Sequence, residues 1–211
     1  NMADTFFVSQ LGTSVSGATG VVFALMAIIN AFGFMFGHGA GSNISRKLGA
    51  HDVESARKFR IHQLLLIIII GALICILGFL FHAPFMRLLE ALTPSFPHAI
   101  EYSTWILIAA PAMASSCVMN NILRYEGKAF FAMLGLASGG ILNIFGDMFL
   151  IFVLKLGVRG AGISTAISQY ISMAILISPF LRGKVQSRLN IRYVTRQFSD
   201  VSNILATGFQ A

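Results

Sequence analysis

Residues 129–154 read AFFAMLGLASGGILNIFGDMFLIFVL and carry one charged side chain, Asp147. An α-helix rises 1.5 Å per residue, so about 20 apolar residues are enough to cross the hydrocarbon core of a bilayer. This stretch is long enough and apolar enough to do so. It therefore predicts a membrane-spanning helix with a carboxylate well inside it.

The same pattern recurs on both sides of this stretch. Small polar residues at 12–17 separate the end of an earlier span, residues 4–11, from the next run. Further runs with almost no charge cover residues 18–39, 61–86, 102–123 and 160–181. The sequence therefore predicts an all-α, polytopic membrane helix bundle of about six transmembrane helices, of which the first is truncated.

Composition and charge agree with a membrane protein. Only 11% of the 211 residues are charged, whereas a soluble domain carries about 25%. The net charge of +7 does not predict a nucleic-acid partner, because the basic residues lie between the apolar runs. Twelve of the 15 Lys and Arg fall on one side of the predicted membrane, in the segments 46–60, 124–128 and 182–196. The positive-inside rule places that side in the cytoplasm. The expected location is the plasma (cell inner) membrane, which the chain would cross several times.

Polar residues inside the spans are the candidates for a functional site. Asn143 precedes Asp147 by four residues, so both side chains lie on one helix face. Asp4 and Thr165 reach a similar depth on neighbouring spans. A carboxylate in such surroundings must be paired, hydrated, or neutralised by a proton or a cation. An amide beside a carboxylate suits a sodium ion or a proton relay, and a plain interhelical hydrogen bond equally well.

Several separated motifs resemble those of the multidrug and toxic compound extrusion (MATE) family. They are NIFGD at 143–147, GVRGAGISTA at 157–166, LRYEG at 123–127, the acid and glycine at Asp4 and Gly12, and the segment from Gly37 to Gly49. The resemblance implies one lobe of a two-lobe, twelve-helix transporter. It places the N-terminal lobe at 1–181, a cytoplasmic linker at 182–203 and the start of a seventh helix at 204–211.

The resemblance also implies roles for individual residues. Asp4, Asn143, Asp147 and Thr165 would bind the coupling ion, a proton or sodium, and Asn120 would line a cavity. The implied function is an antiporter that exports organic, often cationic compounds, with no cofactor and no enzymatic activity. The expected partners are small organic substrates, membrane lipids and a C-terminal lobe of the same full-length chain.

Two alternatives stay open. A lipid-linked oligosaccharide flippase of the same superfamily would need basic residues within the spans to meet a pyrophosphate, and no Lys or Arg lies in the middle of a span. An intramembrane aspartyl protease would need Gly-x-Gly-Asp, whereas Ile144 stands three residues before Asp147.

Overall fold

The computed structural model describes residues 2–10, 12–51, 68–81, 84, 87 and 96–182. Within these residues all regular secondary structure is helical, which confirms the predicted fold class. The elements are α1 (Met2–Ser9), α2 (Thr13–Gly49), a helix at Ile68–Leu80, α5 (Phe96–Tyr125), α6 (Ala129–Asp147), the π-helical turn η1 (Met148–Val153) and α7 (Gly157–Leu181).

Four of the described helices are long and apolar enough to cross a membrane: Ser16–Lys47, Phe96–Tyr125, Ala129–Val153 and Gly157–Leu181. Of the span expected at 61–86, the structure describes a shorter apolar helix, Ile68–Leu80. The linker expected at 182–203 lies outside the described residues except for Arg182, and so does the helix expected at 204–211.

The break between the first two helices is shorter than the sequence predicts. Helix α1 ends at Ser9 and α2 begins at Thr13, and Gly12 just before α2 has a φ of 130°, a conformation that favours glycine. Helix α2 begins at Thr13, so the expected polar break at 12–17 is mostly helical. Its 37 residues are about 55 Å long at 1.5 Å per residue, which exceeds the thickness of a hydrocarbon core. The helix therefore extends past the membrane and ends beyond Arg46 and Lys47.

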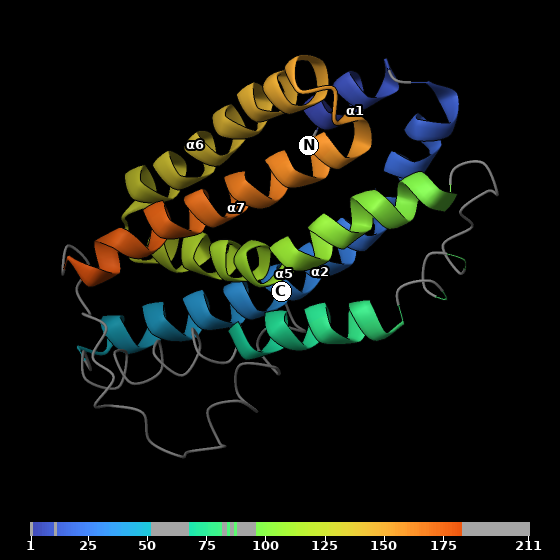
Figure 1. Cartoon of the computed structure of the whole chain (residues 1–211). Coiled ribbons are helices and arrows are strands. Elements are labelled where there is room, and N and C mark those ends of the chain that lie inside the picture. The colour runs from blue at the N-terminus through green and yellow to red at the C-terminus, as the bar shows by residue number, and fades with distance from the viewer. Residues whose placement is uncertain are drawn as a thin grey trace.

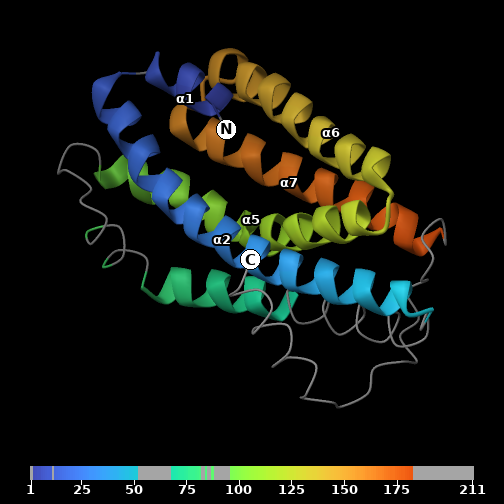
Figure 2. The ribbon, with the colours of Figure 1, turned by 180° about the vertical axis from the view of Figure 1, so that it is seen from behind.

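Helix α2 packs lengthwise against α5 through a seam of glycines spaced four residues apart (Figures 1 and 2). A Cβ atom at Gly33 would lie 2.9 Å from Cβ of Cys117, and one at Gly37 would lie 2.7 Å from Nδ2 of Asn121. A Cβ atom at Gly41 would overlap the ring of Tyr125. The two backbones therefore approach as closely as membrane helices with small residues do. We call Gly33, Gly37 and Gly41 the α2–α5 glycine seam.

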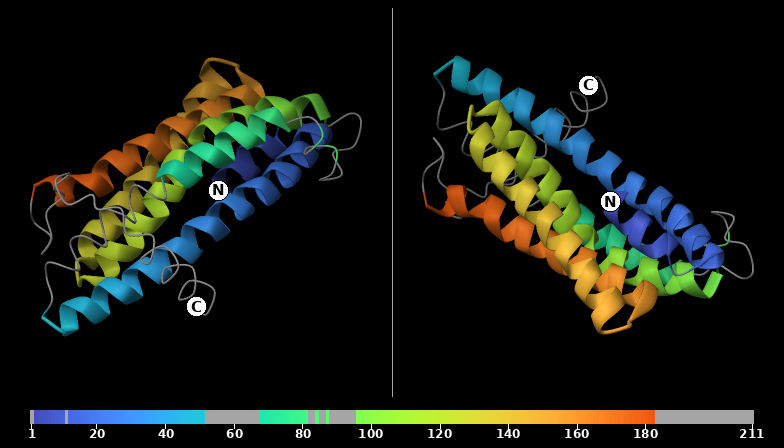
Figure 3. Two further views of the ribbon diagram at one scale, coloured as in Figure 1. Left: turned by 90° about the horizontal axis from the view of Figure 1, so that it is seen from below. Right: turned by 90° about the horizontal axis from the view of Figure 1, so that it is seen from above.

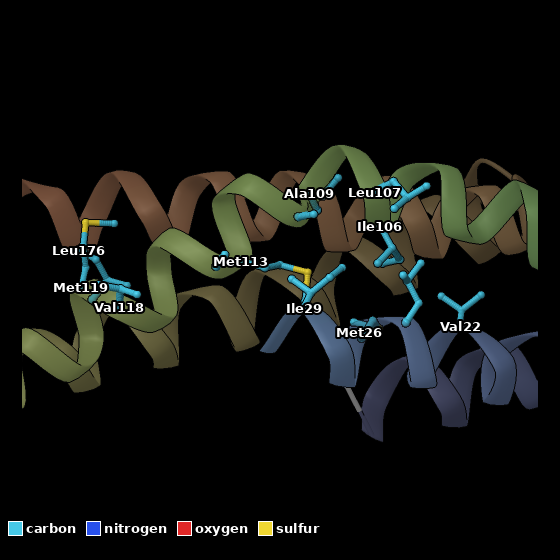
Figure 4. Packing of buried hydrophobic residues seen from close by; sticks show 14 of the residues in the cluster. Val22, Met26, Ile29, Ile106, Leu107, Ala109, Met113, Val118, Met119 and Leu176 are labelled. Carbon is cyan, nitrogen blue, oxygen red and sulfur yellow. The ribbon is translucent and has the colours of Figure 1, made fainter. Parts of the chain in front are cut away.

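Buried apolar side chains fill the contact between α2 and α5 toward the start of α2. Val22, Met26 and Ile29 of α2 face Ile106 and other residues of α5 (Figure 4). Their contact places α5 at the centre of the bundle, because α5 also contacts α6 and α7. The long helices run side by side along one bundle axis (Figure 3).

A second seam of small residues joins α6 to α7. A Cβ atom at Gly139 would lie 3.0 Å from Cβ of Ser172, and Cβ atoms at Gly135 and Gly146 would overlap Leu176 and Ser164. Ser172 Oγ also donates a 2.8 Å hydrogen bond to the carbonyl oxygen of Gly135. Between the two seams lies a cavity that is lined by residues of α2, α5, α6 and α7.

The turn between α5 and α6 fixes which charges share an end of the bundle. The amide of Lys128 donates to the carbonyl of Leu123, and that of Gly127, with a φ of 73°, donates to Arg124, so α5 ends in a Schellman motif. This turn lies at the same end of the bundle as the last turns of α2 and α7 (Figure 1). The basic residues described there therefore share one end, as the predicted topology requires.

Candidate functional site

Asp147 is the last residue of α6 and is completely buried. The helix changes at this point from α to π, because η1 begins at Met148 and the amide of Leu154 donates to the carbonyl of Phe149, five residues earlier. Short π-helical turns inside helices are frequent at functional sites, since they change the direction of the neighbouring side chains. Nothing in the apolar sequence after Asp147 predicts this turn.

The side-chain amide of Asn143 lies among three oxygen atoms. Its Nδ2 is 3.4 Å from Oδ1 of Asp147, 3.4 Å from Oγ of Ser164 and 3.3 Å from Oγ1 of Thr165. Ser164 Oγ in turn donates a 3.0 Å hydrogen bond to the backbone carbonyl of Asn143. All four residues are buried. We call Asn143, Asp147, Ser164 and Thr165 the polar cluster.

The geometry of the polar cluster is that of an oxygen-rich site shared by two helices. An NH₂ group has two hydrogens, so it can serve two of the three oxygens at a time. The three distances also exceed the usual 2.7–3.2 Å of an N–H···O hydrogen bond, which means that no single pairing is tight. The carboxylate and the two hydroxyls can accept a proton or coordinate a hard cation, and Asn143 would join them as an oxygen ligand through its Oδ1 when its amide turns over.

The sequence predicted three members of this cluster, and the structure brings Asn143, Asp147 and Thr165 together. The sequence did not predict Ser164. This serine enters because Gly146, one residue before Asp147, leaves room for the hydroxyl. The one sign in the sequence was that Ser164 is next to Thr165 in the chain. Adjacent residues on a helix point in different directions, so a similar depth in the membrane does not show that both side chains reach Asn143.

Asp4 belongs to α1, and its side chain lies outside the described part of the structure. The helix itself is well placed, because α1 contacts α6 and α7, which carry the polar cluster. The rings of Phe7 and Phe152 meet edge to face with centroids 5.9 Å apart, so α1 packs directly on η1. The role of Asp4 in the site stays a prediction.

The polar cluster adjoins a cavity of about 460 Å³, which we call the main cavity. Asn143 and Thr165 line it at one end, and Arg124, at the last turn of α5, lines it as well. Asn120 also lines it, as the resemblance implied, and its Nδ2 donates a 2.9 Å hydrogen bond to the carbonyl of Ala132 on α6. The cavity lies between the two glycine-containing seams.

A second cavity of about 370 Å³ adjoins the main cavity. Asn30, Met113 and Gln169 line both cavities, so they stand at the border between them. The second cavity extends to Thr5 on α1, the neighbour of Asp4 in the chain. The second cavity therefore continues from the border of the main cavity toward α1, the helix that carries the second predicted acid.

Comparison with known proteins identifies relatives of this bundle. The chain is 31% identical over 179 residues to a FAD transporter of Shewanella oneidensis, covering 83% of the chain and 40% of that protein. It is 27% identical over 207 residues to the multidrug export protein MepA of Staphylococcus saprophyticus, covering 98% of the chain and 46% of MepA. The chain thus spans less than half the length of these relatives.

Solved structures show the same fold. An inward-facing multidrug resistance MATE family transporter of the MOP superfamily matches with a TM-score of 0.93 and 31% identity, over 99% of this chain and 48% of that one. A MOP superfamily transporter from Pyrococcus furiosus matches equally well, over 46% of its length. The MatE family model matches residues 1–149. The predicted resemblance is confirmed, and the chain belongs to the MatE family of membrane transporters.

Proposed function

We propose that the full-length protein is a secondary antiporter that exports small organic compounds in exchange for protons or sodium ions. The observation that carries this proposal is the polar cluster, in which the buried carboxylate of Asp147 shares an amide with two hydroxyls beside a cavity. Ionisable residues within membrane spans mark ion paths by default. Asn143, Asp147 and Thr165, with Asp4, would bind the coupling ion.

The relatives support an exporter of organic molecules. One is named for FAD and another for multidrug export, and neither name indicates a lipid-linked oligosaccharide. The family is one of transporters rather than enzymes, so the aspartyl protease alternative has no support. The sequence predicts cations among the substrates, because no Lys or Arg lies in the middle of a span.

The proposal places the protein in the plasma membrane with a second, C-terminal lobe of the same full-length chain. A secondary transporter needs two halves that move against each other to expose a site to each side in turn. The lengths of the matched structures, about twice that of this chain, support this partner.

Transport by the purified full-length protein in liposomes tests the proposal. Loading the vesicles with ethidium and imposing a proton or a sodium gradient separately should drive efflux with one of the two ions. Efflux at the same rate with neither gradient, or with both collapsed by ionophores, would contradict an ion-coupled antiporter.

A further inference from the structure

The contact between α1 and η1 is made by two phenylalanine rings, each of which follows one of the two predicted acids. Phe7 of α1 and Phe152 of η1 meet edge to face with centroids 5.9 Å apart. Asp4 precedes Phe7 by three residues, and Asp147 precedes Phe152 by five. Helices α1 and α6 both run toward the end of the bundle at which α2 and α7 begin (Figure 1). Both acids therefore come before the ring pair in the same direction along the bundle.

The π-helical turn determines on which side of its helix Phe152 lies. If the α-helix continued past Asp147, a residue five positions later would lie about 140° away around the helix axis. In a π turn the backbone hydrogen bonds join residues five apart, so these residues share a face as residues four apart do in an α-helix. The turn η1 begins directly after Asp147 and includes Phe152. Phe152 and its contact with α1 are therefore on the Asp147 side of the helix.

The same contact sets the position of α1. Residues three apart share a face of an α-helix, so position 4 is on the face of α1 that carries Phe7. Helix α1 contacts both α6 and α7, which carry the polar cluster. A change in the distance between Phe7 and Phe152 would therefore change the depth and the rotation of position 4 relative to Asp147.

Helix α7 holds the backbone of η1 from another direction. A Cβ atom at Gly160 would lie 2.9 Å from the carbonyl carbon of Leu150 and 3.2 Å from the amide nitrogen of Ile151. The amide of Leu156 also donates a 3.0 Å hydrogen bond to the carbonyl of Leu150. The backbones of α7 and η1 are thus in contact, which glycine allows. Phe152 therefore meets Phe7 from a fixed support.

From these contacts we propose that Phe7 and Phe152 are positioning residues of the ion site. Their contact, which the π turn makes possible, holds α1 at the depth and rotation at which Asp4 joins the polar cluster. Neither ring binds the ion, and each acts through the acid that precedes it in the chain. The proposal rests on the proposed function, because it states how the ion site of the same antiporter is assembled.

Ion-driven ethidium efflux by the full-length protein in liposomes, measured over a range of concentrations of the coupling ion, tests the proposal. Phe152→Leu keeps an apolar side chain and removes the aromatic pair, so the ion concentration for half-maximal efflux should rise about three- to tenfold. The maximal rate should stay within about twofold of wild type, since the groups that bind the ion are unchanged. Phe7→Leu should give the same rise, and the double variant no larger one, because both substitutions remove one contact.

Two further variants separate positioning from packing. Phe152→Tyr keeps the ring and should restore the wild-type ion dependence. Phe149→Leu is the matched control, because Phe149 lies in the same turn and its side chain is 54% exposed, against 42% for Phe152. Its ion dependence should not change. The temperature of unfolding in detergent identifies a variant that does not fold, and Phe7→Leu then takes the place of Phe152→Leu.

Cross-linking tests the position of α1 without transport. In a full-length protein whose other cysteines are replaced by Ala, a short bifunctional thiol reagent should join Asp4→Cys to Asp147→Cys. Adding Phe152→Leu should reduce the yield of this cross-link several-fold, and adding Phe149→Leu should leave it unchanged.

An unchanged ion dependence in Phe152→Leu and Phe7→Leu, an equal rise in Phe149→Leu, or a fall in the maximal rate alone would each overturn the proposal. So would a double variant whose rise is the product of the two single rises, or a cross-link that does not depend on Phe152. These outcomes leave ion-driven efflux by the wild type, and with it the proposed function, intact. A cross-link that depends on Phe152 in a protein without ion-driven efflux would instead keep the position of α1 and overturn the proposed function.

Discussion

At the scale of single residues, the site depends on one amide that is shared among more oxygens than it has hydrogens. Asn143 and Asp147 could be predicted together because a spacing of four residues fixes one helix face. Thr165 could be predicted from its depth in a neighbouring span and from the family resemblance, and Ser164 was missed. Serine is common in membrane helices, and its role here depends on a contact with Gly146 on another helix that no local pattern encodes.

Removing the Ser164 hydroxyl tests how the amide is held. Ser164→Ala loses the 3.0 Å hydrogen bond to the carbonyl of Asn143, and the side-chain amide of Asn143 loses one acceptor. The free energy of unfolding should therefore fall by about 1 kcal/mol, and ion-driven efflux should be reduced. Ser138→Ala is the control, because that hydroxyl bonds within its own helix, to Gly135. Thermal unfolding and efflux should both remain near wild type in the control. An equal effect of the two substitutions on efflux would show that Ser164 does not position the amide.

At the scale of elements, the helices could be predicted from apolar runs, but their contacts could not. The structure shows which residues of α5 the glycines of α2 contact. Partners depend on the rotation of each helix about its axis, which composition does not determine in a nearly uniform apolar segment. The start of α2 was misplaced because polar residues such as Thr13 and Ser14 are compatible with a helix start. The turn η1 was missed because no residue type marks a π-helical turn.

The α2–α5 glycine seam makes a prediction about stability. Gly41→Ala places a methyl group against the ring of Tyr125, and such overpacking costs about 1–3 kcal/mol. The temperature of unfolding in detergent should therefore fall. Gly20→Ala, in the same helix but with nothing within 4 Å of its Cβ position, should cause no loss. If both variants unfold at the wild-type temperature, α2 and α5 do not approach as closely as described.

At the scale of the whole molecule, the distribution of basic residues predicts the orientation in the membrane. Ala50 follows α2 at the end that carries Arg46 and Lys47, and Leu156 precedes α7 at the opposite end beside Lys155. Both are exposed. In a variant in which Ala replaces Cys75 and Cys117, a membrane-impermeant thiol reagent should label Leu156→Cys in intact cells. It should label Ala50→Cys only after permeabilisation. Labelling with the reverse pattern would invert the topology.

The central claim is that ion binding at the polar cluster drives export of the substrate, and this involves the whole molecule. Asp147→Asn keeps the shape of the side chain and removes the charge that a proton or sodium ion must neutralise. The most direct test is ion-driven efflux by the full-length protein in liposomes, normalised to the amount of folded protein. We expect near-normal yield of Asp147→Asn with ion-driven efflux abolished. Wild-type efflux per molecule in this variant would contradict the account and leave Asp147 a packing residue.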